Sequence, residues 1–192
     1  MEREQVLNDL YRKINETICD GKLPVAIFRV TKGAKTWSGW NFESVPHSGT
    51  YVIKAAAANL EGPVSQIYAD LFHQIVHILN AENEIRDTSK KGQYHKKEFK
   101  SRAESLGLMI LNKKDGYGFT HIIVPDELIK KVDYPGFEEK LKKAIEEDIK
   151  RIANWRQKET IYYCPVCNQM ARADLKSKFF CGYCNVEMIR KE

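Results

Sequence analysis

The sequence predicts an α+β fold, in which a small antiparallel sheet packs on helices and a four-cysteine zinc ribbon follows. Two observations concern periodicity. Apolar residues recur at three- and four-residue intervals in three long segments, as in amphipathic helices, and shorter β-rich segments lie between turn residues, as strands do. The third observation is a pair of Cys-x-x-Cys motifs near the C-terminus. The 192 residues suffice for one domain and a small appendage, which we expect at residues 1–157 and 158–192.

The first half of the chain is expected to alternate helix and strand. Residues 2–19 predict a helix, because apolar side chains repeat at helical spacing as far as Asp20 and Gly21. A long helix begins after Gly62-Pro63 and runs to about Ala81, since proline is favoured at a helix start. Three short strands are expected between these helices, at residues 26–31, 36–40 and 50–55.

The second half contains shorter elements and one more long helix. Gly107 is a typical helix end, and Asp115-Gly116 is a typical turn between two strands. The expected elements are, in order, a helix near 94–106, a strand pair within 108–124, a helix near 136–155 and a linker at 156–161.

Composition excludes several classes of protein. With 43% hydrophobic and 10% aromatic residues, the chain is too apolar for a disordered protein. The N-terminal segment is charged and no run approaches the roughly 18 apolar residues of a membrane span, so neither a signal peptide nor a transmembrane helix is expected. We therefore expect a soluble, cytoplasmic protein without membrane contact. Its oligomeric state is not predicted.

The formal net charge of +5 comes from one segment. Residues 86–114 hold nine Lys or Arg and only three acidic residues, whereas the rest of the chain is nearly balanced. Such a patch attracts nucleic acid, although a solvated helix face is the alternative interpretation. The candidate nucleic-acid-binding residues are Lys90, Lys91, Lys96, Lys97, Lys100 and Arg102.

Four of the five cysteines form the pattern Cys164-x-x-Cys167 and Cys181-x-x-Cys184, with 13 residues between the pairs. In a chain without a secretion signal this spacing predicts a tetrahedral thiolate site for Zn²⁺ rather than disulfides. Aromatic and basic residues around it are typical of single-stranded nucleic-acid binding. The alternative is that zinc only supplies the folding energy of a module too small for a core.

Three histidines form a second candidate metal site. His73 and His77 are four residues apart on the expected long helix, so both imidazoles project from one face and can meet one ion. This spacing alone is also compatible with a structural pair. His95, expected at the start of the next helix, lies where a loop can fold back to complete the set. Three imidazoles and a water are the usual ligands of an open zinc site.

These segments resemble the SprT-like metallopeptidases, the family that includes the Spartan proteases of DNA–protein crosslinks. The similarity covers nearly the whole chain. It rests on the turn Gly21-Lys22-Leu23-Pro24, on residues 70–77, which are similar to the family's L-L-H-E-x-x-H helix, and on residues 92–99, which resemble the segment that supplies the third ligand. A four-cysteine ribbon is a frequent companion in bacterial and phage members.

The resemblance implies a zincin-like fold and a zinc-dependent endopeptidase that acts on DNA-associated proteins. It implies one catalytic-type Zn²⁺ on His73, His77 and His95, a structural Zn²⁺ on the cysteines, a protein substrate and DNA as a possible partner. The loop residue Asp87 is expected either to orient a ligand imidazole or to cap the loop.

Gln74 departs from the family pattern, because it occupies the position of the glutamate that serves as general base. An amide keeps the shape of a carboxylate but cannot hold the proton of a zinc-bound water, so we expect metal binding to survive and peptidase activity to be lost. Gln74 is either a substitution that inactivates an enzyme or native to a protein that keeps the metal for structure or binding. The alternative function is therefore an inactive, zinc-stabilised nucleic-acid-binding or adaptor protein.

Overall fold

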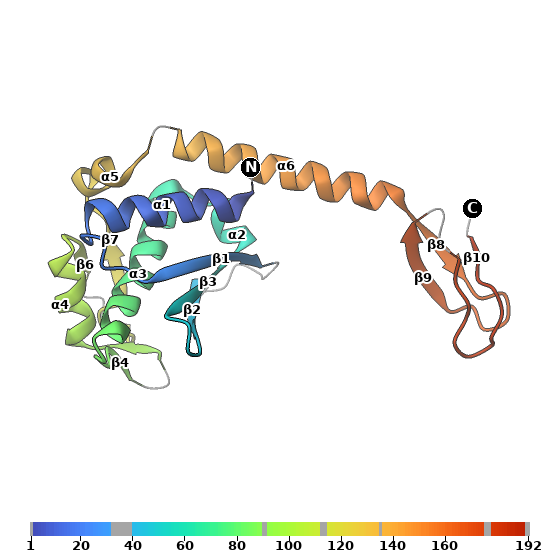
Figure 1. Ribbon diagram of the computed structural model, residues 1–192, viewed down its shortest axis with the longest axis horizontal. Helices are drawn as coiled ribbons and strands as arrows, with labels where there is room; N and C mark the ends of the chain where they lie inside the picture. The colour runs from blue at the N-terminus through green and yellow to red at the C-terminus, as the bar shows by residue number, and fades with distance from the viewer. Residues whose placement is uncertain are drawn as a thin grey trace. The chain divides into compact units, whose positions relative to one another are not determined.

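The computed structural model describes residues 2–31, 40–89, 92–111, 115–134, 136–174 and 178–190, without the side chains of residues 152–159 and 174. The protein has the mixed α+β content that the sequence predicts. It divides into two compact units, Met1–Lys142 and Lys143–Glu192. The division falls inside helix α6 (Phe137–Lys158), and the expected domain boundary at residues 157 and 158 lies near the end of the same helix (Figure 1).

The first unit is built around a three-stranded sheet with the order β1-β3-β2. Its strands are β1 (Val25–Thr31), β2 (Trp40–Val45) and β3 (Thr50–Ala56). β2 runs antiparallel to β3, but β1 runs parallel to it, so the expected antiparallel sheet is in fact mixed. β3 is the most apolar and most buried strand of this sheet, and it lies at the centre because a central strand is covered on both sides.

The strand expected at residues 36–40 falls mostly on residues 36–39, which lie outside the described residues. From Trp40 the chain is a strand, β2, which includes the polar residues Asn41, Glu43 and Ser44. The hydrophobic pattern did not predict this part of β2, because its residues are polar. β2 forms one edge of the sheet and keeps a solvent-exposed face.

Two helices flank this sheet. α1 (Arg3–Thr17) packs on β1, and α3 (Val64–Glu82) packs on β2 and on α4 (Lys97–Ser105) (Figure 1). Both helices lie within two residues of their expected bounds. A short helix α2 (Ala57–Leu60) joins the sheet to α3. The core includes fully buried side chains at helical spacing on α3, namely Ile67, Leu71, Ile75 and Ile78.

Short elements follow α3. They are β4 (Thr88–Ser89), β5 (Tyr94–His95), β6 (Met109–Leu111), β7 (His121–Ile123) and α5 (Asp126–Val132). β6 and β7 form the expected strand pair. The helix expected from residue 94 begins only at Lys97, because Tyr94 and His95 pair with β4 as a strand. α5 was not expected, since it is only seven residues long.

The second unit holds an antiparallel sheet with the order β10-β8-β9. Its strands are β8 (Glu159–Tyr163), β9 (Met170–Asp174) and β10 (Ile189–Arg190). The linker expected at residues 156–161 is wrong: α6 continues to Lys158 and leads directly into β8. Among the described helices, none has the hydrophobic stretch that a transmembrane segment needs.

Candidate metal centre

The structure brings His73, His77 and His95 together. The three Nε2 atoms form a triangle in which every side measures 3.1 Å. Two corners come from consecutive turns of α3 and the third from β5, which is 18 residues further along the chain than His77. The three ring nitrogens point at one another without a bridging residue, and this arrangement is typical of ligands around one cation.

The dimensions of the triangle fit a zinc site. Tetrahedral zinc with Zn–N bonds of about 2.0–2.1 Å places its ligand nitrogens about 3.3–3.4 Å apart. The observed 3.1 Å lies close to this value. Neutral imidazole nitrogen is also a ligand that zinc prefers. The His₃ group can therefore bind a metal ion and is consistent with zinc.

Burial keeps two of the three imidazoles, those of His73 and His95, in the form that binds metal. Burial, with the nearby imidazoles of His77 and His95, lowers the pKa of His73 well below its ordinary value. Burial and His77 also lower the pKa of His95 to about 4. Both rings are neutral at pH 7, and only the neutral ring offers a lone pair to a metal.

An aromatic ring packs against all three histidines. Phe99 on α4 is fully buried, and its ring centroid lies 4.8 Å from those of His73 and His77 and 4.6 Å from that of His95. Phe42 on β2 stacks on His77 with a centroid separation of 5.9 Å. These contacts restrict ring rotation, so the rings are held in place before any metal binds.

His77 has a carboxylate behind it. Its Nδ1 lies 2.8 Å from Oδ2 of Asp87, which is itself buried. Burial opposes ionisation of this carboxyl, but hydrogen bonds from His77 and Asn80 hold the pKa of Asp87 below its ordinary value. The ionised carboxylate accepts the proton on Nδ1 and leaves the Nε2 lone pair for a metal. Of the two roles expected for Asp87, the hydrogen bond to His77 therefore favours orientation of a candidate ligand.

Strand β5 fixes the position of His95 through its backbone. Residue 95 pairs with Thr88 of β4 on one side, and on the other its N–H donates to the carbonyl of Tyr117 and its carbonyl accepts from the N–H of Phe119. The intervening Gly118 has φ +72°, and a Cβ added there would lie 2.1 Å from the His95 carbonyl oxygen. Only glycine allows this close approach.

Gly118→Ala is therefore expected to displace β5 and to weaken zinc binding by about 10-fold or more, in the range seen when groups that orient ligands are lost. Gly116→Ala is a matched control, because Gly116 also has a positive φ (+85°) but has no atom within 4 Å of an added Cβ. The control should show only the backbone strain of about 1–2 kcal/mol. Zinc titration and thermal unfolding measure both effects, and equal zinc affinity in the two variants would contradict the assignment.

Gln74 lies one residue after His73 on α3 and is 6% exposed. Its amide can donate and accept hydrogen bonds, but it does not take up a proton at neutral pH. The residue that follows His73 in the sequence therefore has a buried polar side chain that cannot act as a base.

The second unit contains the four-cysteine group. The Sγ atoms of Cys164, Cys167, Cys181 and Cys184 lie within 4.8 Å of one another, and those of Cys167 and Cys181 are 3.6 Å apart. A tetrahedron with Zn–S bonds of about 2.3 Å has edges of about 3.8 Å. This cluster can therefore bind a metal ion, is consistent with zinc and can form the expected ribbon.

Two similar turns present these cysteines. Asn168 and Asn185 directly follow the two motifs, adopt positive φ values of 59° and 52°, and donate their N–H groups to the carbonyls of Cys164 and Cys181. Asparagine tolerates this conformation better than most residues. The asparagine after each motif is a sequence signal for the turn that sequence reasoning missed.

The thiols influence one another strongly. Backbone N–H groups of Cys184 and Tyr183 lower the pKa of Cys181 to about 7, whereas a hydrogen bond with Cys167 raises the pKa of Cys184 to about 12. Four adjacent thiols cannot all ionise without a cation to offset their repulsion. A divalent ion bound by the four cysteines would supply that charge.

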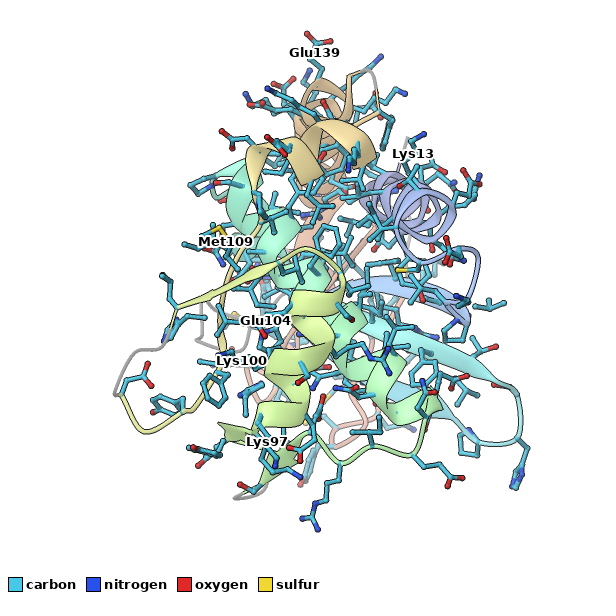
Figure 2. The ribbon with its side chains drawn as sticks, turned by 90° about the vertical axis from the view of Figure 1, so that its left-hand side faces the viewer. Lys13, Lys97, Lys100, Glu104, Met109 and Glu139 are labelled. Carbon is cyan, nitrogen blue, oxygen red and sulfur yellow. The ribbon has the colours of Figure 1, made fainter. Side chains whose placement is uncertain are left out.

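The residues predicted to bind nucleic acid differ in their surroundings. Lys97 is exposed, while Lys96 and Lys100 pair with acidic residues at N–O distances of 4.0 and 3.6 Å. Figure 2 shows Lys97, Lys100 and Glu104 along α4. Arg102 differs, because its Nε donates to Oδ1 of Asn80 at 3.2 Å. Lys90 and Lys91 lie outside the described residues.

Comparisons with protein-family models, curated proteins and solved structures give no significant match to this chain. The features that bear on function are therefore the two groups that could hold a metal ion.

Proposed function

We propose that this chain carries one Zn²⁺ on His73, His77 and His95 in a centre of the SprT-like peptidase type, and a second, structural Zn²⁺ on the four cysteines. The observation that carries the proposal is the triangle of Nε2 atoms with 3.1 Å sides. Three protein ligands leave one of the four positions of tetrahedral zinc for water or substrate, as in zinc hydrolases. When bound, Zn²⁺ supplies a Lewis acid and lowers the pKa of water.

The chain's own residues would divide the remaining work. Asp87 holds the proton on His77 Nδ1, and Phe99 keeps one side of the ligand set apolar. The residue at position 74 would take a proton from the attacking water if it were glutamate. With Gln74 the centre binds metal and substrate but hydrolyses peptide bonds slowly.

We propose proteins bound to DNA as substrates. Lys97 is exposed at the start of α4, two residues after His95, so a polyanion held by this helix would lie beside the candidate centre. The test compares cleavage of a basic DNA-binding protein by the Gln74→Glu variant with and without DNA at two salt concentrations. Cleavage that DNA stimulates and salt suppresses is expected. Equal cleavage with and without DNA would refute this substrate class.

Buried Gln74 favours a second function, a nucleic-acid-binding or adaptor protein that keeps zinc without hydrolysis. It predicts that neither the native chain nor Gln74→Glu cleaves protein, and that Gln74→Glu leaves binding unchanged. Salt-sensitive DNA affinity then distinguishes the nucleic-acid-binding protein from the adaptor.

A further inference from the structure

A chain of hydrogen bonds, buried at its centre, leads from α4 to the candidate metal ligand His77. Nε of Arg102 donates to Oδ1 of Asn80 at 3.2 Å, and Nδ2 of Asn80 donates to Oδ2 of Asp87 at 2.9 Å. The same carboxylate oxygen lies 2.8 Å from Nδ1 of His77. Asn80 is 1% exposed and Asp87 is 7% exposed, so water does not readily replace these partners.

We propose that Arg102 is a positioning residue for the metal ligand His77, acting through Asn80 and Asp87. This inference rests on the proposed metal centre, but it does not require peptidase activity. It gives Arg102 a different role from the exposed Lys97, with which the sequence grouped it as a nucleic-acid contact.

The direction of each hydrogen bond follows from the groups themselves. Guanidinium can only donate, so it requires the amide oxygen of Asn80 to face Arg102. The amide nitrogen must then face Asp87, where an ionised carboxylate can only accept. That carboxylate in turn requires a proton on His77 Nδ1, and the lone pair is left on Nε2.

Loss of the guanidinium would leave the buried Oδ1 of Asn80 without this donor. Rotation of the buried Asn80 amide toward another partner would then lower its free energy. The same rotation would move Nδ2 of Asn80, one of the two donors to Asp87, away from the carboxylate. Asp87 would hold His77 less firmly, and the ring could populate the tautomer with its proton on Nε2. That tautomer cannot bind metal through Nε2.

The test measures Zn²⁺ affinity at the three-histidine site by competition with a chelator, on the full chain with its cysteine site filled. Arg102→Met removes every donor and is expected to weaken binding about 10-fold, within the loss of about 10–100-fold expected for Asp87→Ala. Arg102→Lys keeps a donor and should retain affinity within about 3-fold. Lys97→Met, a matched loss of charge on the same helix, should change nothing at this site.

Unchanged zinc affinity in Arg102→Met would overturn the inference, and so would equal losses in Arg102→Met and Lys97→Met. If Arg102→Met loses DNA affinity but keeps its zinc affinity, Arg102 is a nucleic-acid contact, as the sequence predicts, and not a positioning residue. Thermal unfolding reports whether Arg102→Met is folded. If it is not, Arg102→Ala, which also removes the donor to Asn80, takes its place. A zinc affinity that falls toward that of Asp87→Ala supports the role of Arg102, and native zinc affinity refutes it.

A second readout separates this inference from the proposed function. If the native chain takes up no metal at the histidines, the proposed function fails. The tautomer of His77, read from its ring ¹⁵N shifts in the protein without metal at this site, then tests Arg102. A proton fixed on Nδ1 in the native chain and mixed tautomers in Arg102→Met support the role, whereas identical tautomers in both refute it.

Discussion

Replacing Gln74 with glutamate is expected to raise the rate of peptide hydrolysis by about 10²–10⁴, the usual contribution of a positioned general base. The side chain keeps nearly the same size, and it is buried on α3 one residue after His73, so the change adds a proton acceptor with little repacking. The measurement is single-turnover cleavage of an unfolded polypeptide by zinc-loaded protein. Zinc content should be the same in both proteins, because Gln74 is not among the three ligands.

Gln66→Glu provides a matched control. It makes the same chemical change on α3, eight residues earlier, or about 12 Å along the helix. It should leave the rate at the native level. Gln74→Glu combined with His77→Ala should be inactive, because it restores the base and removes a ligand. If Gln74→Glu binds two zinc ions per chain and still fails to cleave any polypeptide, the centre is not a peptidase centre.

Cys181→Ser is expected to unfold the ribbon. Few large side chains are buried in the described part of this unit; Tyr162, packed against Phe179 at a ring separation of 5.2 Å, is the main one. A module of this size depends on its metal, and structural zinc contributes an apparent 10–16 kcal/mol in small zinc domains, roughly. Loss of one thiolate ligand should remove most of that stabilisation.

Two-dimensional NMR and limited proteolysis check this result. Signals of residues 159–190 should collapse toward unfolded positions in Cys181→Ser, whereas those of residues 2–142 should persist. Cys19→Ser is the control, since Cys19 is buried in the first unit and lies outside the cluster. It should lose stability without losing zinc. A protease-resistant ribbon in Cys181→Ser would show that the cysteines do not hold a structural metal.

The sequence predicts best what local spacing determines. Helical periodicity located α3 within one residue at each end, and the i, i+4 spacing then placed His73 and His77 on one face. The Cys-x-x-Cys pairs indicated the thiolate cluster in the same way. These features depend on residues within one or two turns of each other, so neither required knowledge of the tertiary fold.

The sequence did not predict features that depend on pairing between distant segments. His95 was expected at the start of a helix, but it belongs to a two-residue strand. That strand forms because β4 and the backbone of residues 117–119 bond to it from both sides. The link from Arg102 to Asn80 joins residues 22 positions apart, and nothing in the local pattern separates this arginine from its lysine neighbours. The parallel pairing of β1 and β3 likewise depends on which strand is buried at the centre.

The metal content of the purified chain tests the three-histidine centre most directly. Elemental analysis of the native protein and of His95→Ala, each normalised to protein concentration, counts the ions in each site. The proposed function predicts two zinc ions in the native chain and one in His95→Ala, held by the cysteines. A native chain with a single zinc, or an unchanged count of two in His95→Ala, would contradict it.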